Sequence, residues 1–427
     1  MSVKRVREDL FEEYFTRIEE VLYDEDLRRA SDRATETFAS RKESSLRSLP
    51  YIKYYRKRVR EVKAWSIEHL DELIHEFKEK VEDLGGKVYL AKDRSEACRV
   101  IGEIVGSGKI VLKSKSMTTE EIELNSYLER LNNTVIETDL GERIVQLLHD
   151  KPSHVVVPAV HISRERIAQL FSKVTGKTVP PDPSAIVKVV RGLLRDVYMK
   201  ADVGISGANA LAANTGSIVI VENEGNARFV TNAPPTHVVV CGMEKVVPTL
   251  EDAMIITQVL PPPHATGQRM TSYISVITGP SSTSDIELIS VKGVHGPLEL
   301  HVVLLDNGRL EMRRDPLFKQ ALYCIRCGSC LNACPIYQLL GGNYGCKYFG
   351  GIGVIWTAFN EGFEKAAPLA FACTLCDRCR MECPLELDVP RMIEKLRGLL
   401  SERELIPATL KSATNNILEK GNPLRMD

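Results

Sequence analysis

The sequence lacks long apolar runs and has no marked excess of charge of one sign. Its longest apolar segments, such as 217–221 and 238–241, have the length of single strands. A membrane-spanning helix needs roughly 18–20 such residues. Lys and Arg total 56 and Asp and Glu total 57, a formal net charge of −1. This balance offers no general attraction to nucleic acid or to an anionic membrane. We therefore expect no integral membrane segment and no nucleic-acid partner.

Cysteine is scarce over most of the chain and dense in one part of it. Only Cys98 and Cys241 precede Cys324, whereas nine of the 11 cysteines lie between Cys324 and Cys383. The N-terminal stretch MSVKRVREDLFEEYF is charged and lacks the apolar core of a secretory signal. We therefore expect a cytoplasmic protein, where disulfides are rare. A dense group of cysteines in that compartment indicates metal binding.

The overall composition is that of an ordinary globular protein. Hydrophobic residues make up 44% of the 427 residues, charged residues 26% and aromatic residues 6%. This apolar content argues against disorder as the dominant state. The length suits about two or three domains.

The middle of the chain alternates between helix-like and strand-like segments. A helix with one apolar stripe is expected over 63–84, before Gly85 and Gly86 end it. Strands are expected at 87–91, 109–113, 134–137 and 154–158, with helices at 95–105, 118–131, 141–149, 164–174 and 182–200. Such alternation is typical of an α/β domain with a largely parallel sheet. Further strands are expected at 202–207, 216–222, 236–241, 272–278 and 299–305.

These elements and the cysteine distribution predict five parts. They are an N-terminal helical region (1–62), an α/β domain (63–305), a polar linker (306–317), a cysteine-rich domain (318–400) and a C-terminal tail (401–427).

Two cysteine runs with identical spacing form an internal repeat. The first is C-x2-C-x2-C-x3-C-P from Cys324 to Pro335, and the second, 49 residues later, runs from Cys373 to Pro384. This is the spacing of the bacterial ferredoxins that bind [4Fe–4S] clusters. Structural zinc sites use pairs of CxxC or His partners instead. We therefore predict two [4Fe–4S] clusters.

The fourth cysteine of each run is expected to bind the other run's cluster. Three cysteines at i, i+3 and i+6 wrap one face of a cubane, whereas the proline after the fourth turns the chain away. The first cluster is then assigned Cys324, Cys327, Cys330 and Cys383, and the second Cys373, Cys376, Cys379 and Cys334. Cys346, between the runs, is interpreted as a small buried residue, with a substitute ligand or a redox-sensitive thiol as alternatives. Cys98 and Cys241 are interpreted as core residues.

Residues 208–231 contain the candidate ligand site of the α/β domain. Small and polar residues at strand ends are where α/β sheets usually bind ligands. The candidates are Asn214, Thr215, Gly216 and Ser217 before one expected strand, and Glu222, Glu224 and Gly225 after it. Glu222 or Glu224 could act as a base or nucleophile. The alternative is a pair of tight turns.

Other segments carry weaker signals. Ser114-Lys115-Ser116 suits an anion site or an exposed loop, and His161 is interpreted as structural. Residues 106–109 lack the spacing of a phosphate loop, and 350–353 lack the dinucleotide-binding pattern. The sequence thus shows no flavin or nicotinamide fingerprint.

Several segments, together with the second cysteine run, carry a resemblance to a known family. They are SKSMTTEEIELN (114–125), ETDLGE (137–142), PSHVVVPAVH (152–161), ADVGISGANALAANTGSIVIVENEGNARFV (201–230), VVCGMEKVVPTLEDA (239–253), TGQRMTSYISVITGP (266–280), VVLLDNGR (302–309) and CIRCGSCLNACPIY (324–337). The first seven resemble the lactate-utilisation (LUD) domain, and the two cysteine runs resemble the two-cluster module of the lactate-utilisation protein B family. The resemblance covers roughly residues 25–400 in collinear order.

The resemblance implies a fold and a function. The fold is an α/β LUD domain with a sheet like that of sugar-phosphate isomerases and CoA transferases, followed by a small α-helical ferredoxin-type dicluster domain. The function is the iron–sulfur electron-transfer subunit of a complex that oxidises lactate, or a related 2-hydroxyacid, to pyruvate. The implied partners are a cysteine-rich CCG-type subunit and a smaller LUD protein. No catalytic residues are carried over for the LUD domain.

Two other hypotheses stay open at this point. In one, the protein is a redox hub that feeds a heterodisulfide-reductase-like partner. In the other, the α/β domain is itself a catalyst or ligand sensor and the clusters serve regulation.

Overall fold

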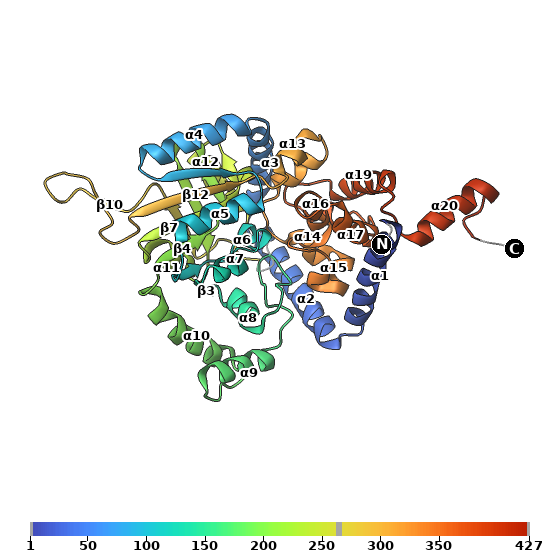
Figure 1. Cartoon of the computed structure of the whole chain (residues 1–427), viewed down its shortest axis with the longest axis horizontal. Helices are drawn as coiled ribbons and strands as arrows, with labels where there is room; N and C mark the ends of the chain where they lie inside the picture. The colour runs from blue at the N-terminus through green and yellow to red at the C-terminus, as the bar shows by residue number, and fades with distance from the viewer. Residues whose placement is uncertain (1–2, 262–266, 425–427) are drawn as a thin grey trace.

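The computed structural model describes residues 3–261 and 267–424. Figure 1 shows an α/β part that contains the sheets beside an all-helical part that contains both ends of the described chain. Among the described residues, no helix combines the length and apolar character needed to cross a bilayer.

The main sheet of the α/β part has six parallel strands in the order β1-β12-β7-β4-β2-β3. Their bounds are β1 Lys87–Ala91, β2 Ile110–Lys113, β3 Thr134–Glu137, β4 Val203–Ser206, β7 Thr236–Gly242 and β12 Glu299–Leu305. In β7, Val238 and Val240 belong to one apolar cluster and Val239 and Cys241 to another. Because successive side chains point to opposite faces, this central strand is buried on both sides.

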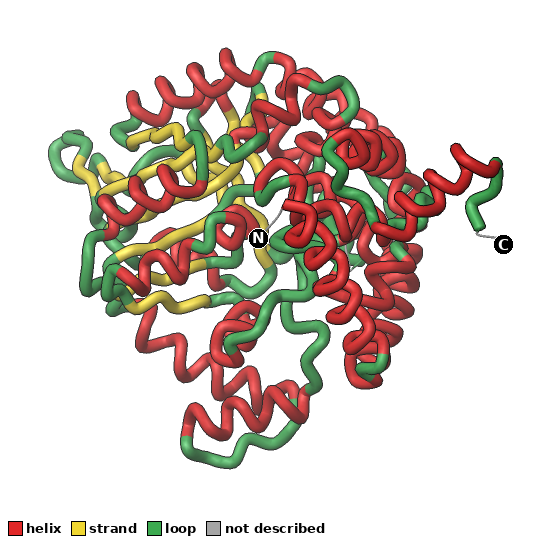
Figure 2. The backbone as a smooth tube through the Cα atoms, turned by 45° about the vertical axis from the view of Figure 1, so that its right-hand side comes forward, coloured by secondary structure: helices red, strands yellow, loops and turns green. Residues whose placement is uncertain are grey.

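Helices cover both faces of this sheet, as Figure 2 also shows. The helix α4 (Leu70–Asp83) packs on one face, and α5 (Arg94–Val105) with α7 (Leu124–Arg130) packs on the other. The remaining helices of this part are α3 Ile52–Glu68, α6 Met117–Glu121, α8 Leu140–Leu148, α9 Arg164–Thr175, α10 Pro183–Tyr198, α11 Asn226–Asn232 and α12 Leu250–Val259. The predicted α/β class with a largely parallel sheet is confirmed.

A second, mixed sheet lies beside the first, in the order β8-β5-β6-β9. Its strands are β5 Ala210–Ala212, β6 Ser217–Glu222, β8 Val246–Val247 and β9 Tyr273–Ile277. A short ribbon of β10 (Ser282–Thr283) and β11 (Val291–Lys292) projects from the body in Figure 1.

Several expected elements differ in the structure. The expected strand at 154–158 is a loop, because His154 Nδ1 accepts the backbone N–H groups of Val156 and Val157. Such local side-chain bonds compete with strand pairing. The helix expected over 63–84 is broken at His69, between α3 and α4, and the one over 118–131 at Glu123, whose φ is 52°.

One expected domain limit lies inside a helix, and another coincides with the end of a strand. The limit between 62 and 63 lies inside α3, whereas the limit after 305 coincides with the end of β12. The expected linker 306–317 contains the helix α13 (Arg309–Arg314), and its first residue has a fully buried side chain. This segment is therefore part of the packed interior and not a free connection.

The helical part combines the N-terminal helices with the cysteine-rich segment. The helices are α1 Val3–Leu22, α2 Glu25–Arg47, α14 Ser329–Ala333, α15 Pro335–Leu340, α16 Gly350–Asn360, α17 Phe363–Ala372, α18 Arg378–Met381, α19 Val389–Glu402 and α20 Ala408–Lys420. The N-terminal residues Phe11 and Tyr14 share one apolar core with Trp356 and Leu396. The helix α20 extends away from the body, as Figure 1 shows.

Candidate functional site

Two small cavities in the helical part are lined by cysteine side chains. The inner cavity is lined by Cys324, Cys327, Cys330, Cys379 and Cys383 and by the apolar residues Ile325, Ile352, Leu385, Leu387 and Val389. The outer cavity is lined by Cys334, Cys373, Cys376 and Cys379. Each cavity contains three cysteines of one run and the fourth of the other. The structure therefore brings together the two sets that the spacing predicts, and Cys379 borders both cavities.

The backbone follows the same path in both runs. The third and fifth residues have positive φ, with values of 62° and 77° at Arg326 and Gly328, and 54° and 65° at Leu375 and Asp377. Non-glycine residues rarely adopt this conformation. In each run this conformation lets the backbone N–H of the third residue donate a hydrogen bond to the Sγ atom of the first cysteine, at 3.4 Å. Hydrogen bonds to cluster sulfurs help to set a cluster's reduction potential.

Burial favours the protonated thiol at two of the cavity cysteines, Cys327 and Cys379. Burial, and then the neighbouring sulfur of Cys383, raises the pKa of Cys327 to about 12. Burial and the nearby sulfur of Cys334 raise the pKa of Cys379 to about 12. Because the thiolate is the metal ligand, iron binding must release these protons.

The donor set fits [4Fe–4S] clusters better than single ions. Within 3–261 and 267–424, no three or more His, Cys, Asp or Glu side chains converge tightly enough to hold one metal ion. Thiols spaced around a small cavity suit a cubane, in which each iron takes one thiolate. When bound, such a cluster supplies one-electron transfer, and the apolar wall of the inner cavity excludes water from it.

The two cavities have different surroundings. Cys327 in the inner cavity is buried, whereas Cys376 in the outer cavity is exposed. The inner run also faces the α/β part, since a Cβ atom added to Gly328 would lie 3.1 Å from His154 Cε1. The inner cavity therefore lies at the junction of the two parts, and the outer one near the surface.

A buried network of charges joins the α/β part to the cysteine-rich segment. The Arg309 guanidinium donates to both carboxylate oxygens of Glu121 at 2.9 Å and to Glu244 Oε2 at 2.6 Å. The Tyr348 hydroxyl donates to Glu121 Oε2 at 2.6 Å. All four side chains are buried. No periodicity or spacing in the sequence predicts this network, because its members come from four separate segments.

Three further cations lie on the cluster side of this network. The Arg326 guanidinium stacks over the rings of Trp356 and Tyr348, at 3.9 and 4.2 Å from their centroids. Lys63 Nζ donates to the backbone carbonyl of Glu244. Burial lowers the pKa of Lys63 to about 7 and also lowers the pKa of Lys245, and the Cys324 sulfur opposes both shifts.

The predicted ligand residues of the α/β domain lie at opposite ends of β6. Thr215 and Ser217 hydrogen-bond through their hydroxyls, and Ser217 also pairs with Thr278. Asn214 donates its backbone N–H to Pro248, and Gly216, with φ of 63°, packs against α4. The glutamates follow the far end of the six-residue strand, roughly 17 Å away. The structure does not bring the two groups into one site.

The two glutamates themselves have different environments. The Glu222 carboxylate accepts the N–H groups of Ala227 and Arg228 and so caps α11, which begins after Gly225. Burial, and then nearby Asp139, raises the pKa of Glu224 to about 7, although its carboxylate accepts the Leu140 N–H. A capping carboxylate has a structural role, whereas Glu224 retains the properties of a proton-exchanging group.

Glu224 is an exposed residue that borders a group of buried charges at the carboxyl ends of β2 and β3. Lys113 Nζ contacts Glu120 Oε1 at 2.6 Å and Glu137 Oε1 at 2.8 Å. Burial, and then the charge of Glu137, raises the pKa of Glu142 to about 8. Lys115 donates to the Val156 carbonyl, so Ser114-Lys115-Ser116 is buried or half-buried and is not an exposed loop.

Two of the three remaining cysteines have the expected burial, whereas Cys346, which was expected to be buried, does not. Cys98 and Cys241 are buried in the apolar clusters of the sheet, which confirms them as core residues. Cys346 is half-buried and lines neither cysteine cavity. It borders a groove between α1 and the cysteine-rich segment.

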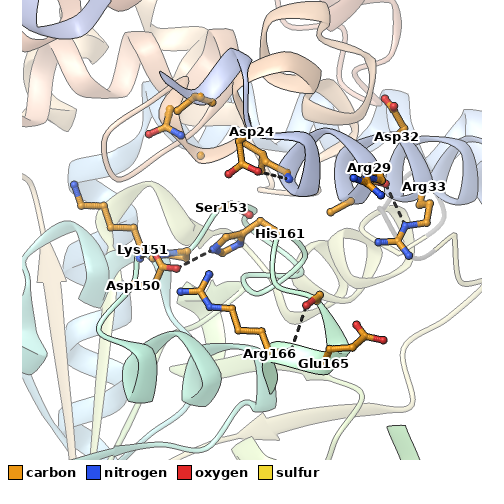
Figure 3. Close-up of a pocket in the computed structure, with 17 residues that line it drawn as sticks. Asp24, Arg29, Asp32, Arg33, Asp150, Lys151, Ser153, His161, Glu165 and Arg166 are labelled. Atoms are coloured by element: carbon orange, nitrogen blue, oxygen red, sulfur yellow. Dashed lines mark hydrogen bonds and ion pairs between the residues drawn. The ribbon is translucent and has the colours of Figure 1, made fainter. Parts of the chain in front are cut away.

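A cavity of about 900 Å³ lies where α2, the loop 150–163 and the turn at 342–343 meet (Figure 3). His161 Nε2 lies 3.4 Å from Asp150 Oδ2. Burial lowers the pKa of His161, although Asp150 opposes the shift. Arg166 faces the same space in Figure 3. The sequence predicts a structural role for His161 and carries no signal for this cavity.

Comparisons with known proteins agree with this architecture. The LUD domain family model matches residues 74–305, and the 4Fe-4S dicluster domain model matches residues 320–387. The chain thus carries two [4Fe–4S] clusters in its C-terminal domain. A DUF162 family protein from Deinococcus radiodurans, of known structure, matches 55% of this chain and 98% of its own at 14% identity, with a TM-score of 0.30.

Relatives match over nearly the whole chain. Lactate utilization protein B of Shouchella clausii is 40% identical and that of Bacillus pumilus 38% identical, each over 91% of this chain and 80% of its own. The uncharacterized electron transport protein YkgF of Escherichia coli is 36% identical over 94% of this chain and 82% of its own. The chain belongs to the lactate utilization protein B family, in which a LUD domain precedes a 4Fe-4S dicluster domain.

Proposed function

We propose that this protein is the iron–sulfur electron-transfer subunit of a complex that oxidises lactate, or a related 2-hydroxyacid, to pyruvate. The observation that carries the proposal is the pair of adjacent cysteine cavities, which share Cys379 on their walls. Relatives named for lactate utilisation and for electron transport support it. Oxidation of a 2-hydroxyacid to a 2-oxoacid releases two electrons and two protons, and each [4Fe–4S] cluster carries one electron.

The cysteines have fixed roles in this proposal. Cys324, Cys327, Cys330 and Cys383 hold the inner cluster, and Cys373, Cys376, Cys379 and Cys334 hold the outer one. The exchange of the fourth ligands ties the two runs together and keeps the clusters close, as electron transfer between them requires.

The proposed partners are a cysteine-rich CCG-type subunit and a smaller LUD protein. The exposure of Cys376 supports docking of a redox partner near the outer cavity. The substrate is oxidised elsewhere in the complex or at the LUD domain, and this chain passes the electrons on.

The proposal is tested on the complex co-purified without oxygen. This subunit should contain about eight irons and eight labile sulfides, and lactate should bleach the cluster absorbance. Deletion of the gene should abolish growth on lactate, and the intact gene should restore it. Full iron content with unimpaired growth on lactate would overturn the lactate assignment and leave the cluster assignment standing.

A further inference from the structure

The inner cavity has an excess of buried positive charge beside it. Lys63, Lys245, Arg309 and Arg326 are four cations, and Glu121 and Glu244 are the two carboxylates that face them. With both lysines protonated, four positive charges face two negative charges, an excess of two. An isolated buried charge is costly unless an opposite charge compensates it.

The carboxylates are already committed to Arg309. Glu121 binds its guanidinium with both oxygens, and Glu244 Oε2 accepts from its Nε atom. Arg326 Nη2 lies 3.7 Å from Glu244 Oε1, beyond hydrogen-bond distance. Lys63 donates to the backbone carbonyl of Glu244 and not to its carboxylate. Among the described residues, the three cations Lys63, Lys245 and Arg326, which we call the cationic wall, therefore share the charge of Glu244 with Arg309.

The cationic wall lies beside the inner cysteines. Arg326 lies between Cys324 and Cys327 in the first run, and its Nη2 atom is 3.7 Å from Oε1 of Glu244. Lys63 donates to the backbone carbonyl of the same Glu244, and Lys245 follows Glu244 in the chain. Lys63 and Lys245 are 2% and 8% exposed, so salt screens their charges little. Near the outer cavity, Arg378 and Arg380 are by contrast exposed, and Arg397 is half-buried and donates to the backbone carbonyl of Cys373.

We propose that Lys63, Lys245 and Arg326 compensate the negative charge of the inner cluster and hold its reduction potential above that of the outer cluster. This inference rests on the proposed cluster binding. A cluster held by four thiolates is an anion and gains one more negative charge on reduction, so nearby buried cations favour the reduced form. Lys63, which lies in α3, and Lys245 both belong to the α/β part. The α/β part is thus a determinant of the redox properties of the cluster domain.

The test measures both cluster potentials in the full-length protein by redox titration followed by electron paramagnetic resonance. Lys63→Met and Lys245→Met each remove one buried charge and keep the length of the side chain. In both variants the higher of the two midpoint potentials should become more negative, and the lower should stay in place. Lys319→Met is the matched control, because Lys319 precedes Cys324 closely but is partly exposed and paired with Glu68. It should leave both potentials unchanged.

Iron content separates the possible outcomes. Protein without clusters would overturn the proposed function itself. Full iron content with unchanged potentials in both variants, or a shift of the lower potential, would overturn the cationic wall and leave the proposed function standing. If the Lys63→Met protein loses iron, Lys63→Arg takes its place in the test, because arginine keeps the positive charge. The Lys63→Arg protein should have the iron content and the potential of the wild type. Failure of Lys63→Arg and an unchanged potential in Lys245→Met would together overturn the inference.

Discussion

At the scale of single residues, the side chains that join the two parts of the molecule are charged. Arg309 is fully buried and stands over the ring of Trp356, 4.8 Å from its centroid, while it binds two carboxylates. Gly242 makes room for this arrangement, since a Cβ atom there would lie 1.9 Å from Glu244 Oε2 and 2.3 Å from Arg309 Nε. Removing one partner of a buried ion pair leaves an uncompensated charge, which is worse than removing both.

We expect Arg309→Met to be strongly destabilising. It leaves Glu121 and Glu244 buried without their main partner, which costs about 3–5 kcal/mol in free energy of unfolding. Arg313→Met, in the same helix, is the control, because Arg313 pairs with the exposed Asp71 and such pairs contribute about 0–1 kcal/mol. Urea titration followed by circular dichroism measures both. Equal losses in the two variants would contradict the role of the buried network.

A second prediction at this scale separates the cluster cysteines from the cysteine between the runs. Cys376→Ser should remove the outer cluster and lower the iron content from about eight to about four per chain, because Cys376 lines the outer cavity. Cys346→Ser should leave the iron content unchanged, since Cys346 lines neither cysteine cavity. Iron analysis of anaerobically purified protein checks both. Loss of iron from the Cys346 variant would make that residue a ligand.

At the scale of elements, a side chain from a neighbouring strand can cap a helix whose own N-terminal residue has no capping side chain. The helix α11 has only seven residues and begins after Gly225, which has no side chain to cap it. Glu222 supplies the missing acceptor from the end of β6 and so fixes the angle between strand and helix. A carboxylate at a helix N-terminus also interacts favourably with the helix dipole.

We therefore expect Glu222→Ala to cost about 1 kcal/mol in free energy of unfolding, as the loss of an N-terminal cap does. Cluster absorbance and iron content should not change, because Glu222 lines neither cysteine cavity. Glu103→Ala is a suitable control, since Glu103 is exposed and pairs with exposed Arg99. Thermal unfolding of the three proteins measures the difference. A loss of turnover without a loss of stability would instead assign Glu222 to catalysis.

At the scale of the whole molecule, buried acids in the α/β part and buried cations near the cluster part give the two parts different responses to pH. Burial and the charge of Glu137 raise the pKa of Glu142 to about 8, and burial and Asp139 raise that of Glu224 to about 7. A carboxyl group with a raised folded-state pKa stabilises the protein fully below its unfolded value near 4.5. This contribution is lost as the pH rises through the folded value.

We expect the melting temperature to fall between about pH 5 and pH 8 and Glu142→Gln to reduce this fall. The amide cannot ionise, so the variant avoids the cost of a buried carboxylate at the upper end of the range. Glu129→Gln, at an exposed position, should keep the wild-type pH dependence. Differential scanning calorimetry at several pH values measures the effect. A parallel shift of the Glu142→Gln curve, with unchanged slope, would contradict it.

The cluster cysteines were predictable from sequence because local spacing determines their geometry. Three thiols at i, i+3 and i+6 reach one cubane whatever the rest of the chain does, and the repeat after 49 residues shows that there are two. The parallel sheet was predictable for a similar reason, because strands buried on both faces need continuous apolar runs. The loop at 154–158 was not predictable, since its apolar run resembles a strand. In the structure the His154 ring accepts two of its backbone N–H groups, which a strand would use for pairing.

Only the tertiary structure decided what surrounds the clusters. Glu121, Glu244, Arg309 and Lys63 are distant in sequence and occur in no common motif, and they meet because α3, α6, η2 (Met243–Lys245) and α13 converge at the junction. The tertiary structure also separates Ser217 from Glu222, because the two residues lie at opposite ends of the strand β6. Ligand spacing is encoded over a few residues, whereas charge compensation acts through space between segments, so the sequence determined the cofactors and the fold determined their electrostatic environment.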